Sequence, residues 1–312
     1  MVFNQKSIVG VCSRSFSKNE KLRLELTKRY RNVVFNDSGL SLSGESLIEF
    51  LKDCDKAIIA LEKIDKNILK CLPKLNVISK YGVGLDMLDL SAMRKYSVNL
   101  GWTGGVNKRS VSEMVVSLSI SLLRKIPQAN KDSILGNWRQ HVGRQLSGKT
   151  FGIIGCGFIG KDLATILQAF DCKVLCHDIL EEPQFYKKHD IQNTELEVLL
   201  KSSDIISIHL PLDNSTRNIL NGKRLNLIKK DTILINLARG GLVDEYELKM
   251  MLREKRIFAA AFDVFENEPP TDMELLKLDN FFVTPHIGGS AEEAIMAMGL
   301  SAIEGLDNFY IP

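Results

Sequence analysis

Short apolar runs alternate with longer polar segments over the first hundred residues. The runs at 7–11, 32–35, 57–61 and 76–79 have the length and composition of buried strands. The segments at 20–30 and 65–71, and one that begins at Ser43, carry leucine and isoleucine among charged residues and predict helices. Strand–helix repeats of this length predict a parallel sheet that is covered by helices on both faces.

The stretch 150–178, TFGIIGCGFIGKDLATILQAFDCKVLCHD, has the most specific pattern in the chain. An apolar run at 151–154 precedes GCGFIG, and an amphipathic segment and a second apolar run at 173–176 follow it. The order predicts a strand, a glycine turn, a helix and a second strand, the context in which GxGxxG spacing indicates dinucleotide binding. A purely structural glycine turn is the alternative, and the flanking strand, helix and terminal acid disfavour it.

Each residue of this motif has a physical task. Gly155 allows the tight turn, Gly157 lets backbone N–H groups approach a pyrophosphate, and Gly160 lets the helix pack closely on the strand. The helix N-terminus adds positive potential for the phosphates. Asp178, at the end of the second strand, can accept a hydrogen bond from a ribose 2′-hydroxyl and would repel a 2′-phosphate. The motif therefore predicts NAD rather than NADP.

Four further apolar runs, at 204–211, 232–238, 258–263 and 281–284, each end in a polar or glycine-bearing loop. The apolar segment at 108–125 predicts a crossover helix between domains, which Pro127 is expected to end. A last helical segment at 291–309 is expected to return to the first domain. We predict two doubly wound parallel-sheet α/β domains, a Rossmann NAD domain (101–287) inserted into a flavodoxin-like substrate domain (1–100 and 288–312).

Composition narrows the class of protein. The 312 residues are 45% hydrophobic and 25% charged, as in ordinary globular domains. The net charge of +3 is too small to indicate nucleic acid or an anionic membrane, and no apolar run reaches the length of a membrane span. Six cysteines show neither disulfide-scaffold nor zinc-ligand spacing, which predicts reduced thiols in the cytoplasm and no metal site.

Three polar residues follow strands of the second domain. Arg239 comes after 232–238, Glu268 after 258–263 and His286 after 281–284. An arginine grips a carboxylate bidentately, and a histidine paired with a carboxylate can exchange a proton near neutral pH. Each residue alone could be structural. Together, at the end of a sheet that binds a dinucleotide, they predict hydride transfer to or from a carbon that bears a hydroxyl group.

Two other segments carry candidate chemistry. KYGVGLDMLDL, from Lys80 to Leu90, follows the fourth strand, and the backbone N–H groups around its glycines could hold a carboxylate. A flexible connector is the alternative. The polar segment 136–148 contains Trp138, one of two tryptophans. It predicts either an exposed arm that contacts a second subunit or a tryptophan packed locally.

The chain resembles the D-isomer-specific 2-hydroxyacid dehydrogenase family, and within it the phosphoglycerate dehydrogenase-like branch. The resemblance runs from KYGVGLDMLDL through NKRSVSEMVVSL, TFGIIGCGFIGKDLA, HLPLDNSTRNIL, INLARGGLVDEYEL and AAFDVFENEPP to TPHIGG. It implies a catalytic set of Arg239, Glu268 and His286, and a substrate carboxylate held around Val83 and Gly84 with Arg239. It also implies NAD contacts at Phe158, Ile159, Asp178, His209, Pro211, Thr216, Ala238, Asp263 and His286, with Asp263 facing the nicotinamide carboxamide.

The resemblance leaves the substrate open. Lys80 stands where phosphoglycerate dehydrogenases of similar pattern have an arginine, so it is a candidate for a distal phosphate or carboxylate, as in 3-phosphoglycerate. A solvated lysine, or one paired with Asp86, is the alternative. Trp102-Thr-Gly-Gly105 departs from the Asn-x-Pro-Gly-like turn of the family, and Glu268 disfavours the formate dehydrogenase relatives. Because the sequence ends at Pro312, no regulatory domain of the longer phosphoglycerate dehydrogenases is expected.

We therefore expect an NAD-dependent enzyme that acts on a small D-2-hydroxy acid or its 2-keto form, as a homodimer formed through the nucleotide domain. The alternative is an NAD-sensing interaction protein like the corepressors of this fold, which keep a similar catalytic set. The small net charge weighs against that alternative.

Overall fold

Five parallel strands form the sheet of the first of two units in the computed structural model, which describes residues 4–312. Unit 1 comprises the residues up to Asn107 together with Glu292–Pro312, and unit 2 comprises Lys108–Ala291. The strand order of unit 1 is β2-β1-β3-β4-β5, the flavodoxin-like order. Its elements are β1 (Asn4–Val11), α1 (Arg14–Lys18), α2 (Glu20–Thr27), β2 (Tyr30–Phe35), α3 (Gly44–Leu51), β3 (Lys56–Ile59), α4 (Lys66–Lys70), β4 (Val77–Lys80), α5 (Leu90–Lys95), β5 (Asn99–Gly101) and α14 (Glu292–Gly305).

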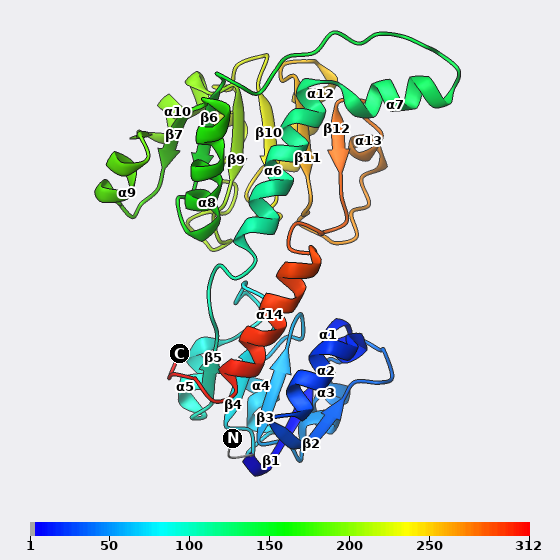
Figure 1. Cartoon of the computed structure of the whole chain (residues 1–312), viewed down its shortest axis with the longest axis vertical. Helices are drawn as coiled ribbons and strands as arrows, with labels where there is room; N and C mark the ends of the chain where they lie inside the picture. Colours follow the sequence, from blue (N-terminus) through cyan, green and yellow to red (C-terminus); the bar gives the residue numbers. More distant parts are fainter. Residues whose placement is uncertain (1–3) are drawn as a thin grey trace. The chain divides into compact units, whose positions relative to one another are not determined.

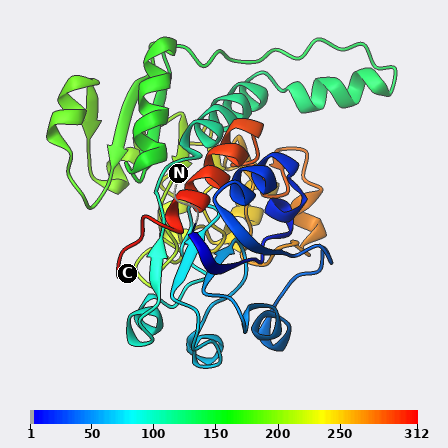
Figure 2. The same cartoon turned by 60° about the horizontal axis from the view of Figure 1, so that its bottom comes forward.

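Helices cover both faces of this sheet (Figures 1 and 2). One apolar cluster joins the strands to α3, α4 and α5, and a second joins them to α1, α2 and α14. Neighbouring residues of β3 enter different clusters, Ala57 and Ile59 the first and Ile58 the second, because side chains alternate along a strand. The two-sided burial explains why the strands are almost uninterrupted apolar runs in the sequence.

The C-terminal segment is held in unit 1 by a polar network. Tyr30 Oη donates to Asp307 Oδ1 at 2.5 Å, and Lys56 Nζ donates to the same carboxylate at 3.1 Å and to Leu306 O at 2.6 Å. Burial, followed by the Asp307 contact, raises the pKa of Tyr30, so the phenol stays a donor. The buried ammonium of Lys56 is thereby paired, and the last residues are fixed to the first sheet.

Seven parallel strands form the sheet of unit 2, in the order β12-β11-β10-β9-β6-β7-β8. Its elements are α6 (Lys108–Leu123), α7 (Ile126–Ile134), β6 (Thr150–Ile154), α8 (Phe158–Leu167), η1 (Gln168–Phe170), β7 (Lys173–His177), α9 (Pro183–Lys188), β8 (Ile191–Asn193), α10 (Leu196–Ser202), β9 (Ile205–Ile208), α11 (Gly222–Leu225), β10 (Ile233–Asn236), α12 (Glu245–Arg253), β11 (Ala259–Phe262), α13 (Met273–Leu276) and β12 (Phe281–Val283). The order reverses between β6 and β9, which is the Rossmann arrangement.

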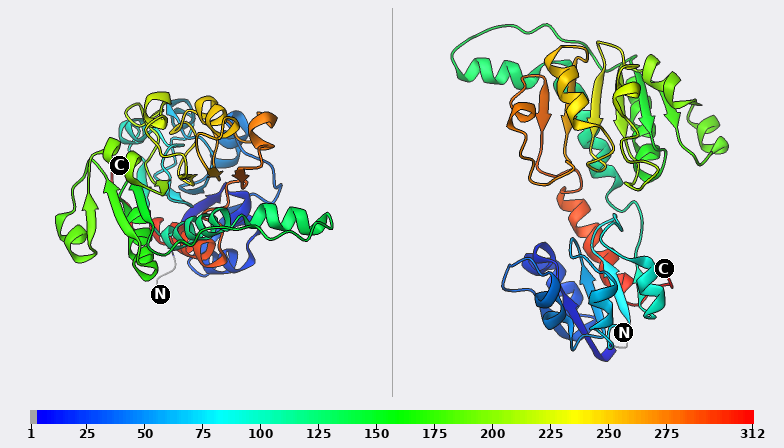
Figure 3. Two further views of the ribbon diagram at one scale, coloured as in Figure 1. Left: turned by 90° about the horizontal axis from the view of Figure 1, so that it is seen from above. Right: turned by 180° about the vertical axis from the view of Figure 1, so that it is seen from behind.

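Two apolar clusters again define two helical layers, which Figure 3 shows from above and from behind. α6 and α8 pack on one face of the sheet, and α10, α11, α12 and α13 pack on the other. The strands alternate between the layers: Ile205 faces the first and Ile206 the second. The predicted fold class, a Rossmann unit whose sequence interrupts a flavodoxin-like unit, is confirmed.

One local prediction was wrong, and one strand was not predicted. Pro127 does not end the helical region, because α6 stops at Leu123, Lys125 adopts a left-handed conformation (φ 54°), and α7 begins at Ile126 with Pro127 in its first turn. Proline is tolerated there because the first N–H groups of a helix have no intrahelical acceptor. The sequence pattern did not predict β5 (Asn99–Gly101), which forms the fifth strand of unit 1.

Candidate active site

The glycine turn of unit 2 is shaped by close backbone approaches. Gly155 has φ 98°, and a Cβ there would lie 2.7 Å from His209 O. A Cβ on Gly160 would lie 2.2 Å from Gly155 O, so α8 can approach β6 only with glycine at that position. Gly157 is exposed, with nothing within 4 Å of its Cβ position, and it supplies no side-chain cap to α8. The first N–H groups of α8 can therefore meet a pyrophosphate.

Asp178 is fixed against this turn. Its Oδ2 accepts from Cys156 N at 2.5 Å and its Oδ1 accepts from Leu180 N at 2.8 Å. The carboxylate thus lies at the carboxyl ends of β6 and β7, where the ribose of a dinucleotide is expected. Nearby, Glu182 Oε1 forms an ion pair with Lys161 Nζ at 2.5 Å. The pair offsets the charge of Glu182, and Asp178 is the carboxylate that we expect to repel a 2′-phosphate.

His286 and Glu268 form a direct pair at the carboxyl edge of the same sheet. Glu268 Oε2 lies 2.8 Å from His286 Nδ1, and Glu268 Oε1 accepts from Phe265 N at 3.1 Å. Both side chains are partly exposed, Glu268 at 38% and His286 at 49%. The backbone bond that holds Glu268 orients its carboxylate toward the imidazole. His286 keeps Nε2 for exchange of a proton.

The loop that presents His286 is built around a buried carboxylate. Asp263 is 1% exposed, and its oxygens accept from Thr284 Oγ1 (2.6 Å), Ile287 N (2.8 Å) and Gly288 N (2.7 Å). His286 has φ 55°, and its own N–H donates to Asp263 O at 2.9 Å. Asp263 therefore holds the strained turn that carries the histidine. Its expected contact with the nicotinamide stays a prediction.

Arg239 follows β10 in a turn that the side chain of Asn236 fixes. Asn236 accepts from Ala238 N at 3.1 Å and donates to Arg239 O at 2.8 Å. A Cβ on Gly240 would lie 1.9 Å from the carbonyl carbon of Phe265, so the Arg239 turn packs on the segment that leads to Glu268. Arg239 Nη1 donates to Ala238 O at 2.6 Å. The sequence did not predict that Asn236 and Thr284 hold these loops. The only indication in the sequence is that each is a polar residue beside a strand end.

The remaining residues that the resemblance assigns to NAD also follow strands of unit 2. His209 comes after β9, its Nε2 lies 2.9 Å from Ser207 Oγ, and burial lowers its pKa to about 3, so its ring is neutral at physiological pH. Pro211 O accepts from Thr216 Oγ1 at 2.7 Å, which closes the loop after β9. Phe158 is exposed, Ile159 is half-buried and Ala238 is buried.

The substrate candidates of unit 1 follow β4. Lys80 is 5% exposed and donates through Nζ to Ala60 O, which rules out the solvated lysine considered from the sequence. Gly82 has φ 125°, and Val83 and Gly84 come next. Trp102 Nε1 donates to Val83 O at 3.1 Å. The indole thus contacts the loop that was expected to hold a carboxylate.

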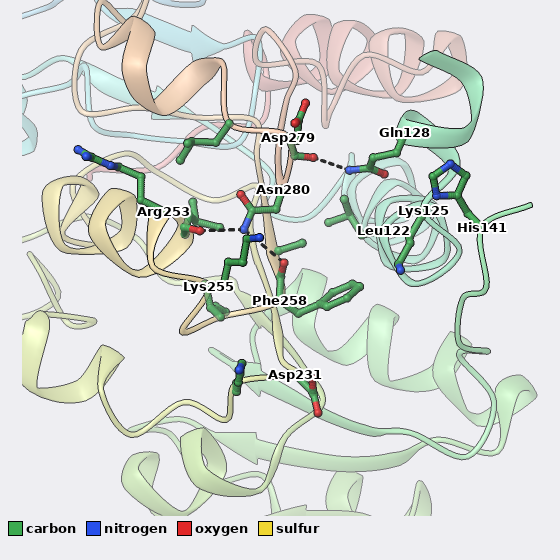
Figure 4. A pocket seen from close by; sticks show the side chains of 15 residues that line it. Leu122, Lys125, Gln128, His141, Asp231, Arg253, Lys255, Phe258, Asp279 and Asn280 are labelled. Atoms are coloured by element: carbon green, nitrogen blue, oxygen red, sulfur yellow. Dashed lines mark hydrogen bonds between the residues drawn. The ribbon is translucent and has the colours of Figure 1, made fainter. Parts of the chain in front are cut away.

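A cavity of about 580 Å³ lies elsewhere in unit 2 (Figure 4). It is lined by Lys230 and Asp231 before β10, by Phe258 before β11 and by Asn280 before β12, so it lies at the amino ends of these strands. None of the candidate site residues lines it. Catalytic groups of parallel sheets gather at the carboxyl ends, so this cavity is not the candidate active site.

Among residues 4–312, no three His, Cys, Asp or Glu side chains gather into a group that could hold a metal ion. Over the same residues, no helix is both long and apolar enough to cross a membrane.

Comparisons with known proteins agree on one family. A sequence model described as "D-isomer specific 2-hydroxyacid dehydrogenase, NAD binding domain" matches residues 116–288. Glyoxylate reductase of Thermofilum pendens is 37% identical over 91% of this chain and 86% of its own length. D-3-phosphoglycerate dehydrogenase of Methanocaldococcus jannaschii is 36% identical over 84% of this chain but only 51% of its own length, so the chain spans about half of that relative. A crystal structure of a Pyrococcus horikoshii protein superposes with a TM-score of 0.83 at 31% identity, covering 97% of this chain and 92% of that one.

Proposed function

Because the chain belongs to the D-isomer-specific 2-hydroxyacid dehydrogenase family, we propose that it transfers a hydride between a nicotinamide and C2 of a small D-2-hydroxy acid or 2-keto acid, with NAD as its cofactor. The observation that carries the proposal is the His286–Glu268 pair, 2.8 Å apart, on the sheet that also presents the glycine turn and Asp178. Bound NAD supplies the acceptor for the hydride.

Residues of this chain are proposed to bind the substrate and to transfer the hydroxyl proton. Glu268 engages His286 Nδ1, so His286 Nε2 is the atom that takes the hydroxyl proton in oxidation and returns it in reduction. The carboxylate stabilises the imidazolium that exists between these events. Arg239 grips the substrate carboxylate and polarises the carbonyl that forms at C2. Val83 and Gly84 are proposed to hold the same carboxylate through backbone N–H groups.

The direct test is oxidation of NADH with a panel of 2-keto acids, including glyoxylate, hydroxypyruvate and 3-phosphohydroxypyruvate. Turnover of at least one member supports the proposal. NADH binding without turnover of any member would favour an NAD-sensing protein instead.

Cofactor preference follows from Asp178. We expect kcat/KM with NADH to exceed that with NADPH, because the fixed carboxylate repels a 2′-phosphate. Asp178→Ala should narrow the ratio by roughly 5- to 150-fold, since a charge clash of this kind costs on the order of 1–3 kcal/mol. Steady-state kinetics with both cofactors checks this. A wild-type preference for NADPH would contradict the role of Asp178.

Lys80 is our candidate for recognition of a distal anion, so the substrate is proposed to include 3-phosphoglycerate. We expect Lys80→Ala to lose kcat/KM on 3-phosphohydroxypyruvate and to keep it on glyoxylate and hydroxypyruvate. Because Lys80 is buried, Lys80→Met serves as the control that preserves side-chain volume. Equal losses on all three substrates, or no loss on any, would make Lys80 a scaffold residue.

We also propose a homodimer formed through unit 2, and a cytoplasmic location in keeping with six free thiols. The support for the dimer is the arm 135–142, which extends from the rest of unit 2 after α7 (Figure 1). Trp138 is 90% exposed, which rules out local packing, and Ile134, Leu135 and Val142 are also exposed. α7 itself has no buried residue. Apolar side chains gathered on one exposed segment are typical of an interface.

The arm predicts a weaker dimer when its apolar residues are removed. We expect Leu135→Ala/Trp138→Ala to raise the dimer dissociation constant by at least tenfold in sedimentation equilibrium, because such anchors dominate interface energy. Leu61→Ala, which changes a similarly exposed apolar residue of unit 1, is the matched control and should have no effect. A monomeric wild type, or a dimer insensitive to both changes, would contradict the proposal.

A further inference from the structure

The loop after β4 has a backbone that is easily reoriented. Gly82 has φ 125°, a conformation that side-chain-bearing residues rarely adopt, and Gly84 follows only two residues later. Residues 81–85 belong to no helix or strand. Glycine has the widest range of accessible backbone angles, so the peptide unit between Val83 and Gly84 needs an outside contact to keep one orientation.

Trp102 supplies that contact. Its Nε1 donates to Val83 O at 3.1 Å, a normal hydrogen-bond length. The indole is itself held in place, since it comes directly after β5 and packs partly buried against the cluster that joins α3, α4 and α5 to the sheet. A side chain fixed to the core of unit 1 therefore grips one carbonyl of a glycine-flanked loop.

Because a peptide unit is planar, the hydrogen bond to Val83 O also constrains the N–H group on the other side of the same peptide unit. Val83 C=O and Gly84 N–H belong to the same trans peptide unit, in which the two groups point in opposite directions. Fixing the carbonyl toward Trp102 therefore fixes the Gly84 N–H away from it. Among the hydrogen bonds of residues 4–312, none uses the Gly84 N–H as a donor. Within the described residues, the Gly84 N–H is thus a fixed donor without a protein acceptor.

The geometry points to Trp102 as a positioning residue, which presents the Gly84 N–H to the substrate carboxylate by holding Val83 O. The inference rests on the proposed function, because the carboxylate is that of the 2-hydroxy or 2-keto acid. It assigns a role to the residue at which the chain departs from the Asn-x-Pro-Gly-like turn of its family. Removing the indole N–H leaves the donor in the loop but lets it turn away.

The test is Trp102→Phe, which keeps an aromatic ring for packing and removes the N–H donor together with the five-membered ring of the indole. We expect KM for the 2-keto acid and the inhibition constant of oxalate, an unreactive carboxylate probe, to rise by about tenfold each. kcat should stay within threefold and the NADH dissociation constant should not change. Unchanged KM and oxalate inhibition would overturn the inference. So would a parallel loss of kcat, NADH affinity and melting temperature, which marks a general structural role.

A second measurement, tryptophan fluorescence, tests the inference without Trp102→Phe and so does not depend on whether that variant folds. The chain has two tryptophans, so in Trp138→Phe the emission comes from Trp102 alone. We expect the emission of Trp102 to change saturably when oxalate is added together with NAD, because oxalate would bind the peptide unit that the indole holds. Oxalate binding detected by calorimetry without any change in emission would overturn the inference. Absence of wild-type turnover on every 2-keto acid is a separate result, because it rejects the proposed function whatever Trp102 does.

Discussion

His286→Ala is expected to lower kcat by roughly 10²–10⁴, with the NADH dissociation constant changed less than about twofold. The imidazole is the only group of the Glu268–His286 pair that can both accept and return a proton near neutral pH. Its predicted NAD contact is one of many, and the phosphates are proposed to meet the first turn of α8, so loss of the imidazole should change NADH binding little. Stopped-flow or steady-state oxidation of NADH measures kcat, and quenching of protein fluorescence measures binding.

The paired variant Glu268→Gln separates proton transfer from structure. Glutamine keeps the size of the side chain, while the imidazolium loses the carboxylate that lies 2.8 Å from Nδ1. Protonated His286 then becomes less stable, so the pH optimum of keto-acid reduction should move to lower pH. An unshifted profile, or a kcat of His286→Ala within tenfold of wild type, would remove this pair from the mechanism.

Gly160→Ala is expected to lower the free energy of unfolding by about 3 kcal/mol or more. The added Cβ would lie 2.2 Å from Gly155 O, a backbone atom that cannot move without pushing β6 away from α8. Because the collision distorts the glycine turn, NADH binding should be lost together with stability. Thermal or urea unfolding without cofactor checks the first effect, and NADH titration checks the second.

Gly157→Ala is the matched control within the same motif. Nothing lies within 4 Å of a Cβ at this position, so the melting temperature should stay close to wild type. The methyl group would instead stand where the backbone is proposed to approach the pyrophosphate, and NADH should bind at least tenfold more weakly. If both variants were equally destabilised, or if Gly157→Ala bound NADH normally, the assignment of separate tasks to the two glycines would fail.

Local pattern determined much of this protein. The central strands are buried on both faces, so runs such as 232–238 and 258–263 are visible without knowledge of their neighbours. The glycine motif is equally local, because the turn, the helix start and Asp178 lie within one strand–helix–strand unit. Arg239, Glu268 and His286 could be nominated because parallel strands place their carboxyl ends at one edge.

Tertiary structure alone decided how these groups are held. Glu268 and His286 meet although they are 18 residues apart in the sequence. No sequence pattern shows that Phe265 N orients the Glu268 carboxylate toward the imidazole. The burial of Lys80 and the bond from Trp102 to Val83 O join different segments of unit 1. Periodicity reports which face of an element is buried. It does not report which atoms of two distant loops face each other, because that is fixed by the packing of the elements that carry them.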